Sequence, residues 1–457
     1  MKARGVSTVL LAWLAFISAC AGSSSAGPVA RGTSVPRFLV AVGTTTVSNP
    51  AIPIESEQAT RFSVIDAGTG RVERTFTLAT GNFRVSTGST VLTPDGRTAY
   101  FFAWNSTGGG SNERSEVIPV DLANGTATHP ISLHTEPSNM VLAGGLLFVA
   151  ETGSAPPPGS PEELLRAMYR KGNSVLVLST STDSIVRTID VCDYPRNLAA
   201  SPDGRTVWVT CGAGGEPSSV RPIDARSLAL GTPIASPAGQ YASNVQFIQG
   251  SHIAIMKSST SDSVNQYETS TRYFISLLNT KAGSLGATVS IPAGDLLGEL
   301  VPGPSRSCSE CILGITENEP VFSGTNPGSI ISSVVGIDLR SGTLTDIPGV
   351  PRIALPATEG SVPPVLLSLP NRDVLVSSDP SLHALSEWTV SPTGTSASAG
   401  TARVLLTVPS SDTGILGSTG YFFYSSLTST VRPFYFDSGK PGKPFHLDFQ
   451  PDFVSSP

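Results

Sequence analysis

Two segments of the sequence repeat one pattern, in which a tight turn separates two runs of apolar residues. Residues 91–102 read VLTPDGRTAYFF and residues 199–210 read AASPDGRTVWVT, so Pro-Asp-Gly-Arg-Thr stands in the middle of both. Asp-Gly between apolar runs is a strong signal for a β-hairpin, because glycine accepts the positive φ of a tight turn. A chain that repeats such a unit is expected to stack copies of one small sheet, since one unit alone cannot bury its apolar face.

A second hairpin follows each of these turns. Residues 117–133 and 174–191 both contain a strand ending in Asp or Ser, a polar turn and a return strand, and residues 62–78 repeat the pattern. Two hairpins make a four-stranded unit, whose strands we letter a to d. These sequences resemble the YVTN-type β-propeller repeat of bacterial exported proteins, in which an SPDG turn joins strands a and b and a TG-like turn joins strands c and d.

The resemblance implies an all-β fold, and the pattern predicts a β-propeller of eight four-stranded blades. Seven a–b hairpins, each followed by a c–d hairpin, are expected at residues 89–103, 139–150, 197–210, 244–256, 297–316, 363–377 and 414–425. An eighth blade is split, because residues 37–43 and 62–78 supply strands b, c and d but no strand a. Residues 450–455 at the C-terminus are expected to supply it and so to close the ring, which removes open sheet edges. The alternative is a propeller of seven blades, which is the usual number in the family that this chain resembles.

The N-terminus has the pattern of an export signal. Lys2 and Arg4 precede an apolar run at residues 6–17 that is too short to span a bilayer. The following Ile-Ser-Ala-Cys, which ends at Cys20, resembles the bacterial lipobox, in which the cysteine is acylated and becomes the mature N-terminus. An ordinary signal peptide with a chance cysteine is the alternative.

This N-terminal pattern predicts the division of the chain and its location. We expect residues 1–19 to be a lipoprotein signal peptide, residues 20–34 a flexible tether and residues 35–457 the propeller domain. The protein would then be a monomer anchored to the cell membrane through acylated Cys20, on the exported face, which is periplasmic or extracellular. The formal net charge of −6 offers no positive excess for phosphate contacts, so nucleic acid is not an expected partner.

The lengths of the connections indicate where a binding site would lie. In a four-stranded blade the a–b and c–d turns lie on one face of the disc, which we call the turn face, and the b–c and d–a connections lie on the other, which we call the loop face. The a–b and c–d turns are short here, whereas the b–c loops are expected to be long at residues 44–61, 104–116, 151–173, 257–272 and 317–332. Long loops on a rigid scaffold commonly carry function, so we expect the binding site on the loop face. Neutral insertion is the alternative.

One of these loops contains a helix signal. Ser160, Pro161 and two glutamates are typical of a helix start, and the residues that follow predict a short amphipathic helix ending before Lys171. This helix is expected either to pack on the rim of the propeller or to contact a partner.

Four cysteines remain besides Cys20. An even number of cysteines in an oxidising compartment is typical of disulfide pairing. Cys192 falls in a d–a connection and Cys211 just after the next strand b, so both lie on the loop face and are expected to form a disulfide. Cys308 and Cys311 form a C-x-x-C pattern in an a–b turn, for which a small structural disulfide is favoured over thiol exchange.

The sequence contains none of the common catalytic motifs, such as G-x-S-x-G, a P-loop or H-E-x-x-H. We therefore expect a non-enzymatic, surface-anchored propeller, without metal or cofactor, that binds a protein, a glycan or a small ligand on its loop face. A lactonase-like or streptogramin-lyase-like hydrolase or lyase is the alternative, and a quinone-dependent dehydrogenase is a more distant one. Propeller enzymes gather carboxylates and amides at the channel mouth, and the residues at comparable positions are the candidate ligand-binding residues Glu136, Asn139, Arg196, Asn197, Asn244 and Glu299.

Overall fold

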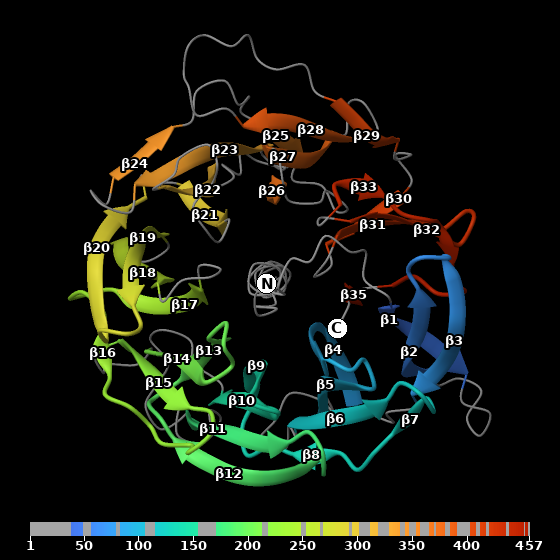
Figure 1. The fold of residues 1–457 in the computed structure, drawn as a ribbon, viewed down its shortest axis with the longest axis horizontal. Helices are drawn as coiled ribbons and strands as arrows, with labels where there is room; N and C mark the ends of the chain where they lie inside the picture. Colours follow the sequence, from blue (N-terminus) through green and yellow to red (C-terminus); the bar gives the residue numbers. More distant parts are fainter. Residues whose placement is uncertain are drawn as a thin grey trace, which may run out of the picture.

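In the computed structural model, the described part of the chain consists of β-strands and turns (Figure 1). The structure describes residues 38–48, 56–78, 83–105, 115–153, 171–212, 218–247, 253–265, 268–291, 295–300, 311–318, 329–338, 343–346, 353–356, 365–369, 372–379, 384–390, 403–407, 412–416, 420–435, 438–451 and 453–455. Within these residues no helix has the length and apolar character needed to cross a membrane.

The described strands form eight antiparallel sheets. The first contains β1 (Phe38–Ser48), β2 (Ser56–Asp66), β3 (Arg71–Leu78) and β35 (Phe453–Ser455). The second contains β4 (Phe83–Leu92), β5 (Thr98–Asn105), β6 (Ser115–Asp121), β7 (Thr126–Ala127) and β8 (Ile131–Ser132). The third contains β9 (Pro137–Ala143), β10 (Leu146–Gly153), β11 (Lys171–Ser179) and β12 (Ser184–Asp190). The fourth contains β13 (Pro195–Ala200), β14 (Thr206–Cys211), β15 (Ser219–Asp224) and β16 (Ile234–Ala235).

The other four sheets follow in chain order. The fifth contains β17 (Tyr241–Phe247), β18 (Ile253–Asn265), β19 (Glu268–Asn279) and β20 (Ser284–Ser290). The sixth contains β21 (Asp295–Leu300), β22 (Cys311–Asn318), β23 (Ser329–Asp338), β24 (Thr343–Asp346) and β25 (Ile353–Pro356). The seventh contains β26 (Val365–Leu369), β27 (Arg372–Asp379), β28 (Ala384–Val390) and β29 (Arg403–Thr407). The eighth contains β30 (Asp412–Leu416), β31 (Gly420–Ser425), β32 (Thr430–Tyr435), β33 (Lys440–Pro441) and β34 (Phe445–His446).

The sheets stand side by side around a common axis, so the fold is a β-propeller and the expected fold class is confirmed (Figure 1). Strands such as β9 and β13 lie near the axis, and strands such as β12 and β20 form the rim. In the third sheet, for example, hydrogen bonds join β9, β10, β11 and β12 in that order. Strand a therefore lies near the axis and strand d at the rim.

Three sheets have five strands rather than the expected four, because their outermost strand is interrupted. In the second sheet both β7 and β8 pair with β6, and in the eighth both β33 and β34 pair with β32. Pro130 lies between β7 and β8, and Pro444 lies between β33 and β34. Proline has no N–H to donate to the neighbouring strand, so the pairing loses a hydrogen bond at each of these two places.

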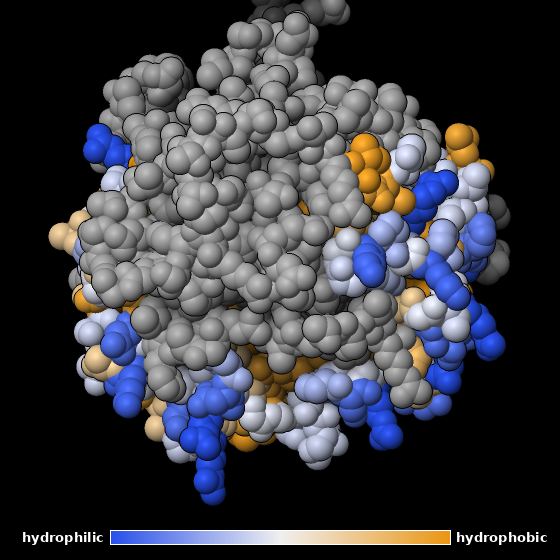
Figure 2. Space-filling model, turned by 45° about the horizontal axis from the view of Figure 1, so that its top comes forward, coloured by the Kyte–Doolittle hydropathy of each residue, from blue (hydrophilic) through white to orange (hydrophobic). Residues whose placement is uncertain are grey.

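The core lies between neighbouring sheets. Phe62 of β2 meets Phe101 of β5 edge to face, with ring centroids 4.7 Å apart, and both side chains are fully buried. Tyr100 and Leu147 belong to the next such cluster, between the second and third sheets. Burial of one side chain of this size contributes about 1.5–3 kcal/mol, so the sheets are held together chiefly by their faces. Hydrophilic side chains protrude along the edge of the described part (Figure 2).

The two Pro-Asp-Gly turns have the same hydrogen bonds. Thr93 Oγ1 donates to Asp95 Oδ1 at 2.6 Å in one turn, and Ser201 Oγ donates to Asp203 Oδ1 at 2.6 Å in the other. Gly96 has φ of +68° and Gly204 φ of +64°, which a residue with a side chain adopts only with strain. The repeated sequence therefore builds repeated turns on the turn face.

The first sheet is completed from the other end of the chain. Val454 of β35 pairs with Ala41 of β1 and is fully buried. The guanidinium of Arg61 lies 2.7 Å from the carboxylate of Asp448 and 5.7 Å from the ring centroid of Phe449, so it holds the segment that leads to β35. The C-terminal segment thus supplies strand a of the first sheet, as the sequence predicts.

All five regions expected to be b–c loops are partly strand. The β5–β6 pairing reaches Trp104 and Ser115, and the β10–β11 pairing reaches Gly153 and Lys171. The β1–β2 pairing continues to Ser48 and Ser56, and the β18–β19 pairing continues to Asn265 and Glu268. Pairing of β22 with β23 likewise reaches Glu317 and Ser332. Residues 44–48 (TTTVS) are mostly β-branched, which favours the extended backbone of this hairpin. Residues 258–264 (SSTSDSV) are mostly serine, so their own sequence does not explain their pairing.

Several expectations concern residues that the structure does not describe. The signal peptide, Cys20 and the tether precede Phe38, and the helix expected to begin at Ser160 and to end before Lys171 falls within residues 154–170. Cys308 is also outside the described residues, and Cys311 begins β22. The anchor, the helix and the second disulfide therefore stay predictions.

Candidate functional site

Most of the candidate ligand-binding residues lie where β9, β13 and β17 begin, at the loop face. The chain there reads Glu-Pro-Ser-Asn from Glu136, Tyr-Pro-Arg-Asn from Tyr194 and Tyr-Ala-Ser-Asn from Tyr241. The three starts stand in successive sheets and carry equivalent residues in equivalent places. Glu299 lies apart from them in β21.

The asparagines of this pattern connect one sheet to the next. Asn139 Oδ1 accepts a hydrogen bond from the backbone N–H of Leu198 at 3.3 Å. Asn197 Oδ1 accepts one from the backbone N–H of Val245 at 3.2 Å, and Asn197 is buried. Because these amide oxygens are bonded to the neighbouring strand, Asn139 and Asn197 have a structural role in the ring.

The charged residues of the pattern are exposed. Both Glu136 and Arg196 are exposed, and the hydroxyl of Ser138 donates to the carbonyl oxygen of Arg196 at 2.6 Å. This contact brings the start of β9 against the start of β13. Tyr241, at the position in β17 that Glu136 occupies before β9, is 44% exposed. A carboxylate, a guanidinium and aromatic rings therefore occupy neighbouring strand starts on the loop face.

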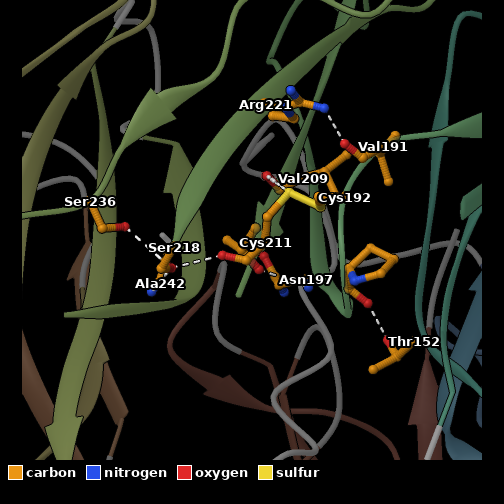
Figure 3. Close-up of a disulfide and its surroundings, with 12 residues drawn as sticks. Thr152, Val191, Cys192, Asn197, Val209, Cys211, Ser218, Arg221, Ser236 and Ala242 are labelled. Atoms are coloured by element: carbon orange, nitrogen blue, oxygen red, sulfur yellow. Dashed lines mark hydrogen bonds between the residues drawn. A yellow bond between two sulfur atoms is a disulfide. The ribbon is translucent and has the colours of Figure 1, made fainter. Parts of the chain in front are cut away.

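A disulfide fixes the connection that leads into this site (Figure 3). Cys192 and Cys211 are bonded, with their Cα atoms 5.8 Å apart, so the first predicted disulfide is confirmed. The guanidinium of Arg221 donates to the carbonyl oxygen of Val191 beside it. The d–a connection between the third and fourth sheets is thus bonded to strands of the sheet that it enters.

Tyr194 stands in this connection in a strained backbone conformation. Its φ is +50°, in the left-handed region, and Pro195 follows it. Such a conformation costs a residue with a side chain about 1–2 kcal/mol, and a following proline restricts the backbone further. The N–H of Tyr194 donates to Gly172 O at 2.9 Å, and the Thr152 hydroxyl donates to Pro195 O. These bonds and the disulfide two residues earlier hold Tyr194 in place.

Ser218 extends the same support to the fifth sheet. Its hydroxyl donates to Cys211 O at 2.7 Å and accepts from the backbone N–H of Ala242, also at 2.7 Å (Figure 3). Because Ala242 follows Tyr241, the two tyrosines flank one hydrogen-bonded unit centred on the disulfide. Tyr194 and Tyr241 are functional candidates that the sequence analysis missed, although the repeated Tyr-x-x-Asn was a signal for them.

A buried carboxylate lies beside this site. Glu151, at the end of β10, is fully buried and accepts from the backbone N–H of His134 at 2.7 Å and from the Ser174 hydroxyl at 2.6 Å. The exposed imidazole of His134 has Nδ1 at 3.5 Å from the same carboxylate oxygen. Burial of a carboxylate is costly unless the carboxylate is hydrogen-bonded, and these bonds offset that cost for Glu151. The bond from His134 also fixes the connection that precedes Glu136.

These side chains define what the site can do chemically. Exposed Arg196 and Glu136 offer donors and acceptors, and the tyrosines offer apolar faces with a hydroxyl at the edge. Among the described residues, no three His, Cys, Asp or Glu side chains are grouped closely enough to hold a metal ion. The arrangement is suited to recognition through hydrogen bonds and stacking.

Comparison with known proteins finds distant resemblances to solved structures. No family model matches the chain, and no curated protein matches its sequence. A structure of hydrazine synthase from Kuenenia stuttgartiensis is 15% identical, with a TM-score of 0.45, over 79% of this chain and 96% of that chain. Apo AztD from Citrobacter koseri is 13% identical, with a TM-score of 0.44, over 92% of this chain and 98% of that chain. TolB from Acinetobacter baumannii is 14% identical, with a TM-score of 0.32, over 67% of this chain and 65% of that chain. None of them identifies a ligand or an activity for this chain.

Proposed function

We propose that this protein is an exported propeller, anchored to the membrane through acylated Cys20, that binds a protein, a glycan or a small ligand on its loop face and is not an enzyme. The observation that carries the binding proposal is the rigid presentation of Tyr194 and Arg196. A residue in the left-handed region is kept only where the surroundings hold it, and such residues cluster at functional sites.

The bonds that hold the strand starts in place favour a binding function. A surface that is ordered before the ligand arrives loses less conformational entropy on association than a mobile one. The disulfide, Ser218 and the asparagines provide this order for the starts of β13 and β17. We therefore expect binding by a preformed surface, with little backbone movement.

The disulfide also supports export. Disulfides persist in secreted and periplasmic proteins and are rare in reducing compartments. The Cys192–Cys211 pair is consistent with the lipobox pattern at Cys20. Substitution Cys20→Ala is expected to release folded protein from the membrane fraction, because Cys20 precedes the proposed propeller domain, which begins at residue 35. Retention of this variant after a high-salt wash would contradict the anchor.

The binding proposal is tested with a glycan array and with an affinity screen of exported proteins, each probed with the oxidised protein. The double variant Glu136→Gln/Arg196→Ser and the single variant Tyr241→Ala should each lose binding to the ligands found. Arg205→Ser, an exposed arginine of the same sheet on the turn face, is the matched control and should keep it. Equal binding by all variants would contradict a loop-face site, and hydrolysis of a lactone panel by the wild type would favour the enzyme.

A further inference from the structure

We propose that Asn124 is a site of self-modification, at which the chain converts its own asparagine into aspartate and isoaspartate through a cyclic imide, and that the isoaspartate form loosens the contact between the first and second sheets. The substrate besides the chain is water. This inference is independent of the anchor and of the binding site, because Asn124 lies on the turn face.

The site is the c–d turn of the second sheet, which joins β6 to β7. In this turn Asn124 is followed by Gly125, and the sequence contains no other Asn-Gly pair. Asn124 is exposed, so water and hydroxide reach its side chain. Gly125 has no side chain to shield its backbone nitrogen, whereas every other described asparagine is followed by a residue with a side chain. Asn124 is therefore the described asparagine most open to attack by the next backbone nitrogen.

The reaction needs only water and a base from the solvent. The nitrogen of Gly125 gives its proton to the base and attacks Cγ of Asn124, which forms a C–N bond. The bond from Cγ to Nδ2 breaks, and Nδ2 leaves as ammonia with a proton from water. Water then opens the imide, at Cγ to give aspartate or at the backbone carbonyl carbon to give isoaspartate. A water molecule is consumed for each ammonia released, and nothing is oxidised or reduced.

The two reacting groups are held apart by hydrogen bonds to Asp121. The N–H of Gly125 donates to Asp121 O at 2.8 Å, and Nδ2 of Asn124 donates to Asp121 Oδ2 at 2.6 Å. The turn therefore has to open before the nitrogen attacks. Strand β7 after the turn has only two residues paired with β6, so opening breaks few bonds. Such local opening needs far less free energy than unfolding of the core.

The two Pro-Asp-Gly turns are internal controls, because there too a glycine follows a side chain that can form an imide. The Thr93 hydroxyl lowers the pKa of the Asp95 carboxyl, and the Ser201 hydroxyl lowers the pKa of the Asp203 carboxyl. Both carboxyl groups are therefore ionised at neutral pH. A carboxylate repels the nucleophile that the neutral amide of Asn124 accepts, so these aspartates should react far more slowly.

The first sheet supplies a matched control variant. Thr69 stands in its c–d turn where Asn124 stands in the second sheet, and its N–H and hydroxyl donate to Asp66 Oδ1 at 2.7 and 2.9 Å. Threonine thus fits this position and forms no imide, so Asn124→Thr should keep the turn and remove the reaction. Gly125→Ala is unsuitable, because φ is +70° and the added Cβ would lie 2.8 Å from the ring of Phe76.

The turn also contacts the neighbouring sheet, so its modification has a structural consequence. The guanidinium of Arg74 in β3 donates to the carbonyl oxygens of Leu122 and Ala123, and Gly125 packs on the ring of Phe76. Isoaspartate adds an atom to the backbone just before Gly125 and so displaces this packed glycine. Aspartate keeps the backbone and only replaces a donor by a carboxylate. The larger disturbance is therefore expected from isoaspartate.

The experiment ages the oxidised full-length protein and its Asn124→Thr variant in heavy-oxygen water at mildly alkaline pH, both folded and unfolded in urea. Peptide mass spectrometry follows each asparagine, and electron-transfer fragmentation distinguishes isoaspartate from aspartate. We expect Asn124 to be the first described asparagine to lose its amide, while Asp95 and Asp203 stay free of isoaspartate. Reaction through global unfolding would be at least about a thousandfold slower than in the unfolded chain, and we expect less retardation than that.

Hydrogen exchange at the amides of β3 and β7 measures the consequence. Exchange should become faster in the aged wild type in proportion to the isoaspartate formed. It should stay unchanged in the aged Asn124→Thr variant, which reports ageing at all other positions. The fresh variant Asn124→Asp carries the new charge on an unaltered backbone, and its exchange should rise less than that of the aged wild type.

The outcomes test the site and its consequence separately. Earlier loss of another described asparagine, or a retardation of about a thousandfold or more in the folded protein, overturns the site. Equal exchange in fresh and aged wild type, once isoaspartate has formed, overturns the loosening of the sheet contact. Exchange that rises as much in Asn124→Asp as in the aged wild type would assign the effect to charge, and so would contradict the role of the lengthened backbone.

Discussion

The amide oxygen of Asn197 accepts a hydrogen bond from the buried backbone N–H of Val245, in the next sheet, at 3.2 Å. Asn139 makes the equivalent bond to Leu198 one sheet earlier. Hydrophobic attraction between the sheet faces is not directional, whereas a hydrogen bond from one side chain to one backbone group fixes where that side chain lies. These asparagines therefore set the register of three consecutive sheets.

Substitution Asn197→Ala should lower the free energy of unfolding by about 1–3 kcal/mol, because the Val245 N–H would be left buried without a partner. Asn139→Ala should have a smaller effect, since Asn139 is only half-buried. Urea unfolding of both variants checks this order. A loss in Asn139→Ala that equals or exceeds the loss in Asn197→Ala would contradict the argument.

The double variant Cys192→Ser/Cys211→Ser should unfold at lower urea concentration than the oxidised wild type. The cysteines are 19 residues apart in sequence. Closure of a loop of this length stabilises the folded state by roughly 3 kcal/mol in the chain-entropy model. The reduced wild type is the control and should unfold like the double variant. Peptide mapping without reductant should recover the two cysteines in one linked fragment, and free thiols at both would contradict the assignment.

Tyr194→Gly should be more stable than Tyr194→Ala by about 1 kcal/mol, because only glycine adopts positive φ without strain. Both substitutions remove the ring, so their difference reports the backbone alone. Thermal unfolding of the two variants gives the comparison. Equal stability would mean that residue 194 does not have the left-handed conformation in solution.

The Pro-Asp-Gly turns predict a dependence on pH. The hydroxyl of Ser201, followed by the N–H of Arg205, lowers the pKa of the Asp203 carboxyl, and Thr93 lowers the pKa of Asp95 in the same way. A lowered pKa in the folded state gives stability that is present above the unfolded pKa of about 4 and is lost as pH falls through the folded value. Ser201→Ala should therefore destabilise the protein at pH 7, by less than about 1 kcal/mol because the turn is exposed, and less at pH 3. Ser201→Thr, which copies Thr93, should restore the difference, and a penalty that grows on acidification would be the opposite of this expectation.

Deletion of residues 453–457 should destabilise the whole ring, because it removes β35 and leaves strand β1 without its inner partner. Deletion of residues 456–457, which follow β35, is the matched control and should have little effect. Hydrogen exchange at the amides of β1 and the thermal unfolding midpoint are the measurements. Slow exchange at β1 in the longer deletion would show that closure adds nothing to its protection.

Most of the architecture could be predicted from local sequence, because hairpins are specified by their own turns. Asp95-Gly96 and Asp203-Gly204 each determine a turn without help from distant residues. The C-terminal strand could be placed as well, since the first sheet otherwise lacked one strand. The paired extensions of β18 and β19 were missed because a Ser- and Thr-rich segment pairs or loops according to its neighbours.

The candidate site was less predictable than the fold. Asn139 and Asn197 have the residue type expected at a channel mouth, but their role depends on the backbone groups of the adjacent sheet. Tyr194 was hidden because sequence alone does not reveal a positive φ at a non-glycine residue. The buried carboxylate of Glu151 likewise depends on partners from two other segments, His134 and Ser174. Glu136 and Arg196 stay candidate ligand-binding residues, because both side chains are exposed on the loop face.

The pairing of β1 with β35 joins the first described strand to the last. Val40 lies opposite Ser455, so the inner edge of the first sheet stays open until the end of the chain has emerged. Contacts that distant in sequence form slowly, and an unpaired strand edge exposed meanwhile is prone to aggregate. If the chain is exported from its N-terminus, as proposed above, ring closure is a late step of its delivery. A chain that ends before residue 453 would then present β1 as an open sheet edge, to which a strand of a second chain can add.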